Sequence, residues 1–369
     1  MADDNSTGVT GNANATTQAA TTFFDLSGWL LFATIEFYIN YAVIVIGIVG
    51  IAANALVLYA LIVHRAQEAK KKGVQLLIIN QNLLDLCCCV TVVICLSIRV
   101  SNIYLTGAVG YILCRIFINE SAALSLLSAT VINLMALTIE RYLKVVYPFW
   151  SKKNLKQWMI HAAIGFSWIG GILSVVPVGL VTSFAVEGTC LAFQLFWEYP
   201  PIKVGYSVWS FLSFFLFPLI IFVYCYGHIV VVMRKQMRVM AGHNVEGSAQ
   251  SASQAQSKRI KWNIIKTMII ISVFFIICCC PLNIYVMVVD DMQKSYELTI
   301  GYFATLFLPY VNISLNPFIY ATKHEGVRRI LSRMITCRKC DDVAAVSGTS
   351  GTNTSIGTKK RNTAVAPRQ

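Results

Sequence analysis

The stretch AALSLLSATVINLMALTI, residues 122–139, is an apolar run whose interior contains no ionisable side chain. It is followed directly by Glu140, Arg141 and Tyr142. A charged side chain near the centre of a bilayer costs several kcal/mol. Arg141 is therefore expected at a membrane interface or beside a partner, for which Glu140 is the adjacent candidate. A basic anchor that merely ends a helix would also explain Arg141 alone, so the rest of the chain must decide.

The composition places the chain in a membrane. Of the 369 residues, 56% are hydrophobic and 13% are charged, with a mean hydropathy of +0.64, whereas soluble domains carry about 25% charged residues. The net charge of +13 does not indicate a nucleic-acid partner, because the charges lie in the segments that connect apolar runs. No nucleophile–base pair, metal cluster or phosphate loop indicates an enzyme.

Seven apolar segments are long enough to cross a bilayer, which takes about 20 residues each. These segments are Phe37–Val63, Val74–Ile98, Tyr111–Val145, Trp158–Thr182, Val204–Met233, Ile264–Val289 and Leu298–Ala321. They predict an all-α membrane protein whose seven-helix bundle occupies residues 37–322. Residues 1–36 are polar and contain no Lys or Arg, so they are expected to form an extracellular tail without a cleavable signal peptide.

The basic residues set the expected orientation, because cytosolic loops carry an excess of Lys and Arg. With the N-terminus outside, only four of the 30 lysines and arginines fall on or near the outer side: Arg99, Arg115, Lys203 and Lys294. This arrangement predicts a multi-pass plasma-membrane protein with a cytosolic C-terminus. Asn5 and Asn14 then lie in extracellular sequons that can be glycosylated.

The twelve cysteines support this orientation. Eight lie within spans, where a reduced thiol behaves as a small apolar group, and Cys337 and Cys340 are cytosolic. Cys114 and Cys190 remain in the oxidising compartment and suffice for one disulfide. That disulfide would tie the outer end of the third span to the loop after the fourth.

The segments outside the spans are expected to form a linker, an interfacial helix and a disordered tail. Residues 241–257 form a Gly/Ser/Ala/Gln stretch that predicts a flexible linker. Residues 323–340 are amphipathic and predict an interfacial eighth helix on membrane lipid. Cys337 and Cys340 at its end are candidate palmitoylation sites, and a zinc site is weakly supported because no second ligand pair lies nearby. Residues 341–369 predict a disordered tail whose hydroxyls can accept phosphate.

Almost every span carries a polar or proline signature. Asp85 is a lone carboxylate in the second span, and Asn312, Asn316 and Pro317 interrupt the seventh. Proline inside a helix frees backbone carbonyls and kinks the helix. Kinked helices with internal polar groups can hold two packings of similar energy, which a switch requires.

With these residues in order, the chain resembles the rhodopsin-like (class A) G-protein-coupled receptor family from Phe37 to about Cys340. Glu140-Arg141-Tyr142 is similar to the family's D/E-R-Y triplet, and Asn316-Pro317-x-x-Tyr320 is similar to N-P-x-x-Y. Further landmarks match at Asn54, Asp85, Trp168, Pro218, Pro281 and the Cys114–Cys190 pair. Each match is weak alone, but their order, span after span, is specific. The resemblance implies a ligand-activated receptor for a heterotrimeric G protein, with arrestin and receptor kinases as partners of the tail.

The resemblance also implies roles by position. A polar network with room for a sodium ion would comprise Asn54, Asp85, Thr130, Asn312 and Asn316. The coupling switch would comprise Glu140, Arg141, Tyr142, Tyr226, Asn316, Pro317 and Tyr320. Side-chain repacking between ligand and switch would involve Val131, Pro218, Phe275, Cys279 and Pro281. For Asp85 alone, a hydrogen bond between packed helices is the simpler alternative, and no structural metal or other cofactor is expected.

Three departures from the family pattern change what is expected. Cys279 stands where the family usually has a tryptophan, so another residue must sense the ligand. Lys261 replaces the acid that commonly pairs with Arg141, which leaves Glu140 as the main restraint and predicts signalling without ligand. Cys114 lies 27 residues before Arg141, two more than usual, so the upper third span is out of register.

The ligand class follows less directly. Amine receptors of this family carry an aspartate in the upper third span, and the corresponding position here is Ala123. Glu120 is the nearest acid, so an amine ligand is disfavoured but remains an alternative. Residues 298–320 contain no lysine for a retinal Schiff base. The segment from Thr182 to Ala192 predicts a short hairpin, and the acidic outer rim would suit a basic peptide. We therefore expect a peptide, with lipids and other small molecules as alternatives. A seven-span transporter or channel is disfavoured because no internal repeat is visible.

Overall fold

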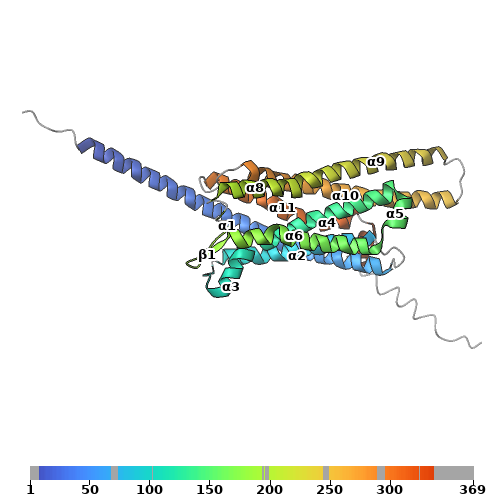
Figure 1. Ribbon diagram of the computed structural model, residues 1–369, viewed down its shortest axis with the longest axis horizontal. Helices are drawn as coiled ribbons and strands as arrows, with labels where there is room; N and C mark the ends of the chain where they lie inside the picture. Colours follow the sequence, from blue (N-terminus) through green and yellow to red (C-terminus); the bar gives the residue numbers. More distant parts are fainter. Residues whose placement is uncertain are drawn as a thin grey trace, which may run out of the picture.

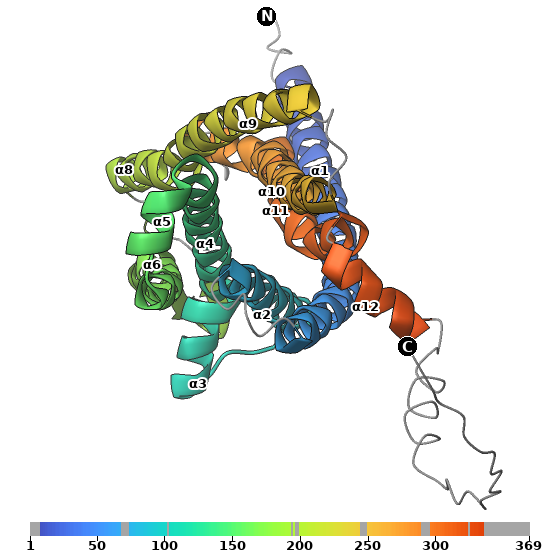
Figure 2. The same ribbon diagram turned by 90° about the vertical axis from the view of Figure 1, so that its right-hand side faces the viewer.

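The computed structural model describes residues 8–67, 74–101, 103–192, 195, 199–243, 249–288, 296–323 and 325–335. Long helices run side by side along the molecule (Figure 1), and viewed along their length they form a ring (Figure 2). All seven predicted segments are helical in this bundle, so the predicted fold class is confirmed. Asn5, Cys337 and Cys340 lie outside the described residues, as do the side chains of Asn14 and Lys261.

Five of the seven spans are single helices. They are α1 (Gly8–Gln67), α2 (Val74–Val100), α6 (Gln157–Thr182), α10 (Ala249–Val288) and α11 (Tyr296–Lys323). Within the described residues, six spans are long and apolar enough to cross a membrane, and α11 is not among them. The polar side chains of Asn312, Ser314 and Asn316 lower its hydropathy, but all three are buried inside the bundle.

The third span is interrupted where the sequence showed two surplus residues. It consists of α3 (Gly107–Ile112), the π-helix η1 (Leu113–Ile118) and α4 (Ser121–Val146). Between η1 and α4, Glu120 has a left-handed backbone with φ of 62°. The Asn119 side chain bridges the break, since its Nδ2 donates to Arg115 O (2.8 Å) and its Oδ1 accepts from Ser121 N (3.0 Å). The wide π turn and the left-handed residue thus absorb the altered register.

The fifth span is also composite. It runs through α8 (Pro200–Phe211), the π-helix η2 (Leu212–Leu216) and α9 (Phe217–His243). Pro218 is buried and follows η2 almost directly. Proline has no N–H to donate and its ring clashes with the preceding turn, so the π-helix lies where the regular hydrogen-bond ladder cannot continue.

Helical structure extends into two segments that were predicted to be a tail and a linker. The first helix begins at Gly8 rather than near Phe37, and its N-terminal part projects beyond the bundle (Figure 1). No proline interrupts residues 12–35, and glycine occurs there only at Gly28. In the predicted linker, α9 continues to His243 and α10 begins at Ala249. The linker prediction was wrong for these residues, because a run rich in Ala, Gln and Ser without proline is compatible with helix.

A hairpin packs against α3 and η1 at the beginning of the third span. Strands β1 (Phe184–Val186) and β2 (Thr189–Leu191) pair antiparallel, with Ala185 opposite Cys190. The turn places Glu187 and Gly188 at φ of 50° and 79°, which is typical of a two-residue hairpin turn. Cys190 forms the predicted disulfide with Cys114, so the hairpin is covalently attached to η1. The hairpin prediction is confirmed.

Two short helices complete the fold. Helix α5 (Pro148–Asn154) follows α4, and α12 (Glu325–Ile335) follows α11. Figure 2 shows α12 lengthwise while the long helices are seen nearly end-on, so α12 crosses the end of the bundle. Val327 and Ile330 are buried in the bundle core. Its placement on a lipid surface stays a prediction.

Candidate functional site

Asp85 is the centre of a polar network that joins three helices. The side chain is completely buried on α2. Its Oδ2 accepts a hydrogen bond from Asn316 Nδ2 of α11 (2.9 Å), and its Oδ1 accepts one from Thr130 Oγ1 of α4 (3.3 Å). The structure therefore brings together three of the residues that the resemblance assigned to this network.

Gln81 is a further member of the network that sequence reasoning missed. Its Nε2 donates to Asp85 Oδ1 (3.4 Å), and its Oε1 accepts from Asn133 Nδ2 of α4 (2.8 Å). Gln81 precedes Asp85 by four residues, and this spacing places both side chains on one face of a helix. A polar residue at that spacing inside an apolar span was the signal that could have identified it.

The oxygen atoms near Asp85 suit a small hard cation. Asn54 donates from Nδ2 to Gly50 O (3.0 Å) and to Ile313 O (3.2 Å). The side-chain oxygens of Asn54, Asn312 and Asn316 are buried and have no hydrogen-bond partner among the described residues. Carboxylate and amide oxygens are the ligands that hard cations prefer. The donor set beside Asp85 therefore fits a sodium ion with bound water.

Near the C-terminal end of α4, Arg141 is held by one loose ion pair among the described residues. Its Nε lies 3.5 Å from Glu140 Oε2, and the two residues are only 8% and 4% exposed. Glu140 also pairs through Oε1 with Lys144, one turn further along α4. Arg141 Nε and Nη2 make no hydrogen bond within the described part of the chain. Glu140 is thus shared between two cations.

The tyrosines assigned to the switch lie on different sides of Arg141. Tyr226 and Tyr320 are both buried within electrostatic range of Arg141. The Tyr226 hydroxyl is 3.0 Å from Thr138 Oγ1, which links α9 to α4. Tyr142 points elsewhere, because its hydroxyl is 3.2 Å from His228 Nδ1 of α9. The structure therefore does not group Tyr142 with Arg141, and Pro317 lies buried inside α11.

Aromatic contacts lead from the centre of the bundle to this switch. Phe275 packs edge-on against Phe222 with ring centroids 6.2 Å apart, and Phe222 lies 6.4 Å from Tyr226. Val131 and Cys279 belong to the same buried cluster. Phe222 was missed from sequence, although it lies four residues before Tyr226. Pro281 lies inside α10 two residues beyond Cys279, and Asn283 Nδ2 donates to Cys279 O (2.9 Å).

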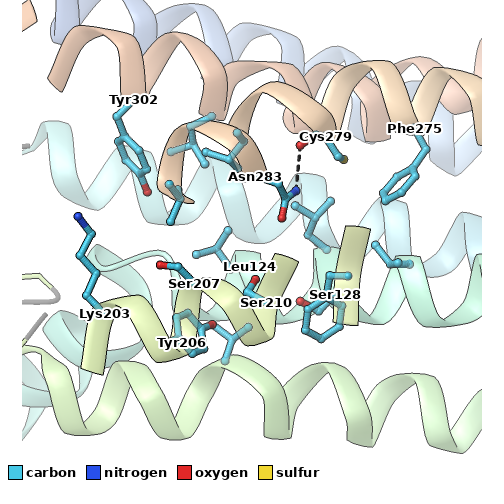
Figure 3. Close-up of a pocket in the computed structure, with 17 residues that line it drawn as sticks. Leu124, Ser128, Lys203, Tyr206, Ser207, Ser210, Phe275, Cys279, Asn283 and Tyr302 are labelled. Atoms are coloured by element: carbon cyan, nitrogen blue, oxygen red, sulfur yellow. Dashed lines mark hydrogen bonds between the residues drawn. The ribbon is translucent and has the colours of Figure 1, made fainter. Parts of the chain in front are cut away.

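A cavity of about 200 Å³ opens above this cluster. It is lined by α4, α6, the α8–η2 segment, α10 and α11. Figure 3 shows Phe275 at one end and Lys203 with Tyr302 at the other, and Cys279 lies between them on α10. Because Cys279 is small where the family usually has tryptophan, the cavity reaches Phe275 directly.

A charge cluster lies at the other end of α4, around Glu120. Arg99 donates from Nη1 to Glu120 Oε1 (3.0 Å) and from Nη2 to Glu36 Oε1 (2.9 Å). The Tyr310 hydroxyl donates to Glu120 Oε2 (2.5 Å). The cluster connects α1, α2, the break in the third span and α11. It was not predicted, although charged residues at the ends of apolar spans are expected to pair.

These features together match a known family. The model of the 7 transmembrane receptor (rhodopsin family) matches residues 53–320. The chain belongs to this family. The receptor is 24% identical over 295 residues to somatostatin receptor type 4 of Rattus norvegicus, and the alignment covers 79% of this chain and 71% of the relative. It is 24% identical over 305 residues to the allatostatin-A receptor of Bombyx mori, and the alignment covers 79% of this chain and 78% of the relative. It is 25% identical over 307 residues to melanopsin of Podarcis siculus, and the alignment covers 80% of this chain and 61% of the relative.

The receptor's broken third helix changes which residues line the cavity. Glu120 contacts Arg99 and Tyr310 and does not line the cavity. Ala123 is completely buried and does not line it either. The helix contributes Leu124, Ser128 and residues further along the same face. An amine ligand would therefore meet no carboxylate among the residues that line this cavity.

Proposed function

We propose that this multi-pass receptor lies in the plasma membrane with its N-terminus outside. It binds an extracellular ligand in the cavity and activates a heterotrimeric G protein at its cytosolic end. The observation that carries this proposal is the continuous packing of Phe275, Phe222 and Tyr226 between the cavity floor and the surroundings of Arg141. Coupling between distant sites is carried by packed elements with two arrangements, and the prolines and π-helices supply places where the helices can rearrange.

A peptide is the ligand class that we propose. Two of the relatives are named as receptors for somatostatin and allatostatin-A. The β1–β2 hairpin at the outer end of the third span suits an extended peptide, which can contact strand backbones. Amine and lipid ligands are the rival classes. A reporter screen with peptide, amine and lipid libraries tests the choice, because a response confined to amines or lipids would refute it.

Removing Arg141 is expected to abolish most G-protein activation. Arg141→Ala deletes the charged group that lies within electrostatic range of Tyr226 and Tyr320, so the proposed cytosolic rearrangement loses its central charge. We expect ligand-independent nucleotide exchange in cell membranes to fall at least about tenfold, the equivalent of roughly 1.4 kcal/mol. Wild type and variant must be compared at equal surface expression. Equal exchange in the two proteins would contradict the assigned role.

We further propose that sodium binds beside Asp85 and favours the inactive packing. Asp85, Thr130, Asn312 and Asn316 would hold the ion, and the bound cation would offset the buried negative charge. Sodium should therefore stabilise the purified wild-type receptor against heat more than potassium at equal ionic strength. Asp85→Asn should abolish that difference. A sodium effect that survives in Asp85→Asn would place the ion elsewhere.

A further inference from the structure

The described residues that line the cavity offer a ligand no free charge. None of them is an aspartate or glutamate, and Lys203 is the one residue among them with a cationic side chain. Lys203 is already engaged in an interaction within the protein, so its ammonium group is not left without a partner. A charged group of a ligand would lose its water here and gain no counter-ion, which is costly. The lining therefore favours an uncharged group.

The described carboxylates near this end of the bundle do not change that balance. Glu36 and Glu120 both pair with Arg99, and Glu187 is exposed at the turn of the hairpin. None of the three glutamates lines the cavity. The sequence-based expectation of an acidic rim that attracts a basic peptide is thus not supported by these residues, while the aspartates at positions 290 and 291 lie outside the described residues.

Three serines of the cavity differ from other serines of the bundle. Ser128 lies on α4, and Ser207 and Ser210 lie on α8. A serine inside a helix commonly donates its hydroxyl to a carbonyl three or four residues back, as Ser125 and Ser174 do here. The three cavity serines make no side-chain hydrogen bond with any described residue. Their hydroxyls therefore remain available to a ligand.

Asn283 of α10 completes this polar set. Its Nδ2 donates to Cys279 O at 2.9 Å, and because a carbonyl oxygen can only accept, this contact fixes the orientation of the amide. Asn283 Oδ1 has no hydrogen-bond partner in the described part of the chain. Figure 3 shows Asn283 on the α10 side of the cavity and the three serines on the other side. A ligand group between them must donate a hydrogen bond to Oδ1 if that oxygen is to be paired.

An uncharged carboxamide matches this set better than other common polar groups. Its two N–H bonds can point to Asn283 Oδ1 and to one serine oxygen, while its carbonyl accepts from another serine hydroxyl. A carboxylate only accepts, so it would face Asn283 Oδ1 with no proton between them. An ester likewise has no proton to donate, and an ammonium group would find no carboxylate here.

The size of the cavity limits what it can hold. Its volume of about 200 Å³ is below the roughly 300 Å³ at which pockets begin to enclose whole drug-sized ligands, so it can bury one end of a larger ligand. The inner end of the cavity is apolar and includes Val131 and Phe275. An apolar group next to the carboxamide would therefore contact Phe275, the first ring in the aromatic path to Tyr226.

We propose that the cavity binds an uncharged carboxamide at the end of a larger ligand, held between Asn283 and the three cavity serines, with an adjacent apolar group directed toward Phe275. The inference deepens the proposed receptor function and rests on it. Two sources supply this chemistry, the amidated C-terminus of a peptide and a fatty-acid amide, and activation assays separate them.

The first test compares four small ligands with the same phenylpropyl chain: 4-phenylbutanamide, methyl 4-phenylbutanoate, 4-phenylbutanoate and 4-phenylbutylamine. Their binding to the full-length receptor in lipid nanodiscs is measured by ligand-observed NMR, with empty nanodiscs as the correction for partition into lipid. We expect the amide to bind at least about tenfold more tightly than each of the others, because the ester and the carboxylate leave Asn283 Oδ1 unpaired and the ammonium group has no counter-ion. Equal binding of amide and ester, a preference for either charged ligand, or no binding of the amide would overturn the proposal.

Variants assign the preference to particular side chains. Asn283→Leu keeps a similar side-chain size and should abolish the preference for the amide over the ester. Ser207→Ala combined with Ser210→Ala should weaken binding of the amide about three- to tenfold, since neutral hydrogen bonds are lost. Ser174→Ala is the matched control, because Ser174 donates to Gly171 O within α6 and does not line the cavity.

Three results with these variants would overturn the proposal. The first is a preference for the amide that survives Asn283→Leu. The second is wild-type affinity for the amide in the double serine variant. The third is an equal loss of affinity in Ser174→Ala, which would assign the effect to serine removal in general.

The source of the carboxamide is tested by signalling. Peptide mixtures with apolar last residues are compared as C-terminal amides and as free acids, beside oleamide, in a G-protein activation assay. Activation by the amides but not by the acids, lost in Asn283→Leu, supports an amidated peptide. Activation by oleamide alone, lost in the same variant, supports the carboxamide and assigns it to a lipid. Equal activation by acids and amides would overturn the proposal.

Failure of this inference and failure of the receptor function give different results. If Arg141→Ala lowers ligand-independent nucleotide exchange while the wild type shows no preference for the amide, only this inference fails. If exchange is equal in wild type and Arg141→Ala, the proposed receptor function itself is contradicted.

Discussion

Glu140→Gln is expected to raise ligand-independent G-protein activation by about three- to tenfold. Glu140 is the carboxylate that pairs with Arg141 in the described structure, and the 3.5 Å separation makes the pair loose. If removing it shifts the balance toward the active packing by roughly 1 kcal/mol, a minor active population rises several-fold. A nucleotide-exchange reporter at equal surface expression measures the change.

Lys144→Gln is the matched control, with the opposite expected sign. Lys144 competes with Arg141 for Glu140, so its removal frees the carboxylate to hold Arg141 and should lower basal activation. If both variants raised basal activation equally, a general change of charge at the cytosolic face would explain the effect. Unchanged activation in Glu140→Gln would show that Glu140 does not restrain Arg141. The replacement of the usual acid by Lys261 would then not make Glu140 the main restraint.

Arg99→Met is expected to remove most folded receptor from the cell surface. The substitution leaves Glu120, which is 6% exposed, without its cation. Removing one partner of a fully buried ion pair costs about 3 kcal/mol or more, and the cost is smaller here because the Arg99 side chain is 30% exposed. Even about 2 kcal/mol for a charge left unpaired is a large share of the roughly 5–15 kcal/mol that separate folded from unfolded proteins. Surface staining and the thermal stability of the purified receptor report the loss.

Glu120→Gln provides the rescue that identifies the cause. In the Arg99→Met background it removes the stranded negative charge, and the amide oxygen can still accept the hydrogen bond from Tyr310. We expect the double variant to recover a large part of the surface expression, because replacing both partners of a buried pair costs less than removing one. Normal expression of Arg99→Met alone, or no recovery in the double variant, would contradict this account.

Sequence patterns predicted the membrane bundle because each span is a mainly apolar run of the required length. The order of the landmarks also indicated the family, and two cysteines outside the cytosol predicted the Cys114–Cys190 disulfide. The helix from Gly8 and the helical ends of the 241–257 segment were not predicted. Their polar composition resembles that of tails and linkers, yet without proline it does not prevent a helix.

The candidate site shows a similar division. Asp85, Thr130 and Asn316 were identified by position, and the structure places them in hydrogen-bond contact. Tyr142 follows Arg141 in the sequence, but consecutive side chains on a helix point in different directions, and Tyr142 contacts α9 instead. Gln81 and Phe222 each precede a recognised residue by four positions, so a search for polar or aromatic partners one helical turn away would have found both.

The sequence by itself determined the class of protein and the positions of the seven helical spans, because hydropathy and short ordered motifs are local properties of the chain. Only the tertiary structure decided that Glu120 pairs with Arg99 and that the cavity between the helices extends past Cys279 to Phe275. These are relations between different helices. The pairing of Glu120 depends on the left-handed backbone at this residue and on the preceding π-helical turn η1, which together set the direction of its side chain.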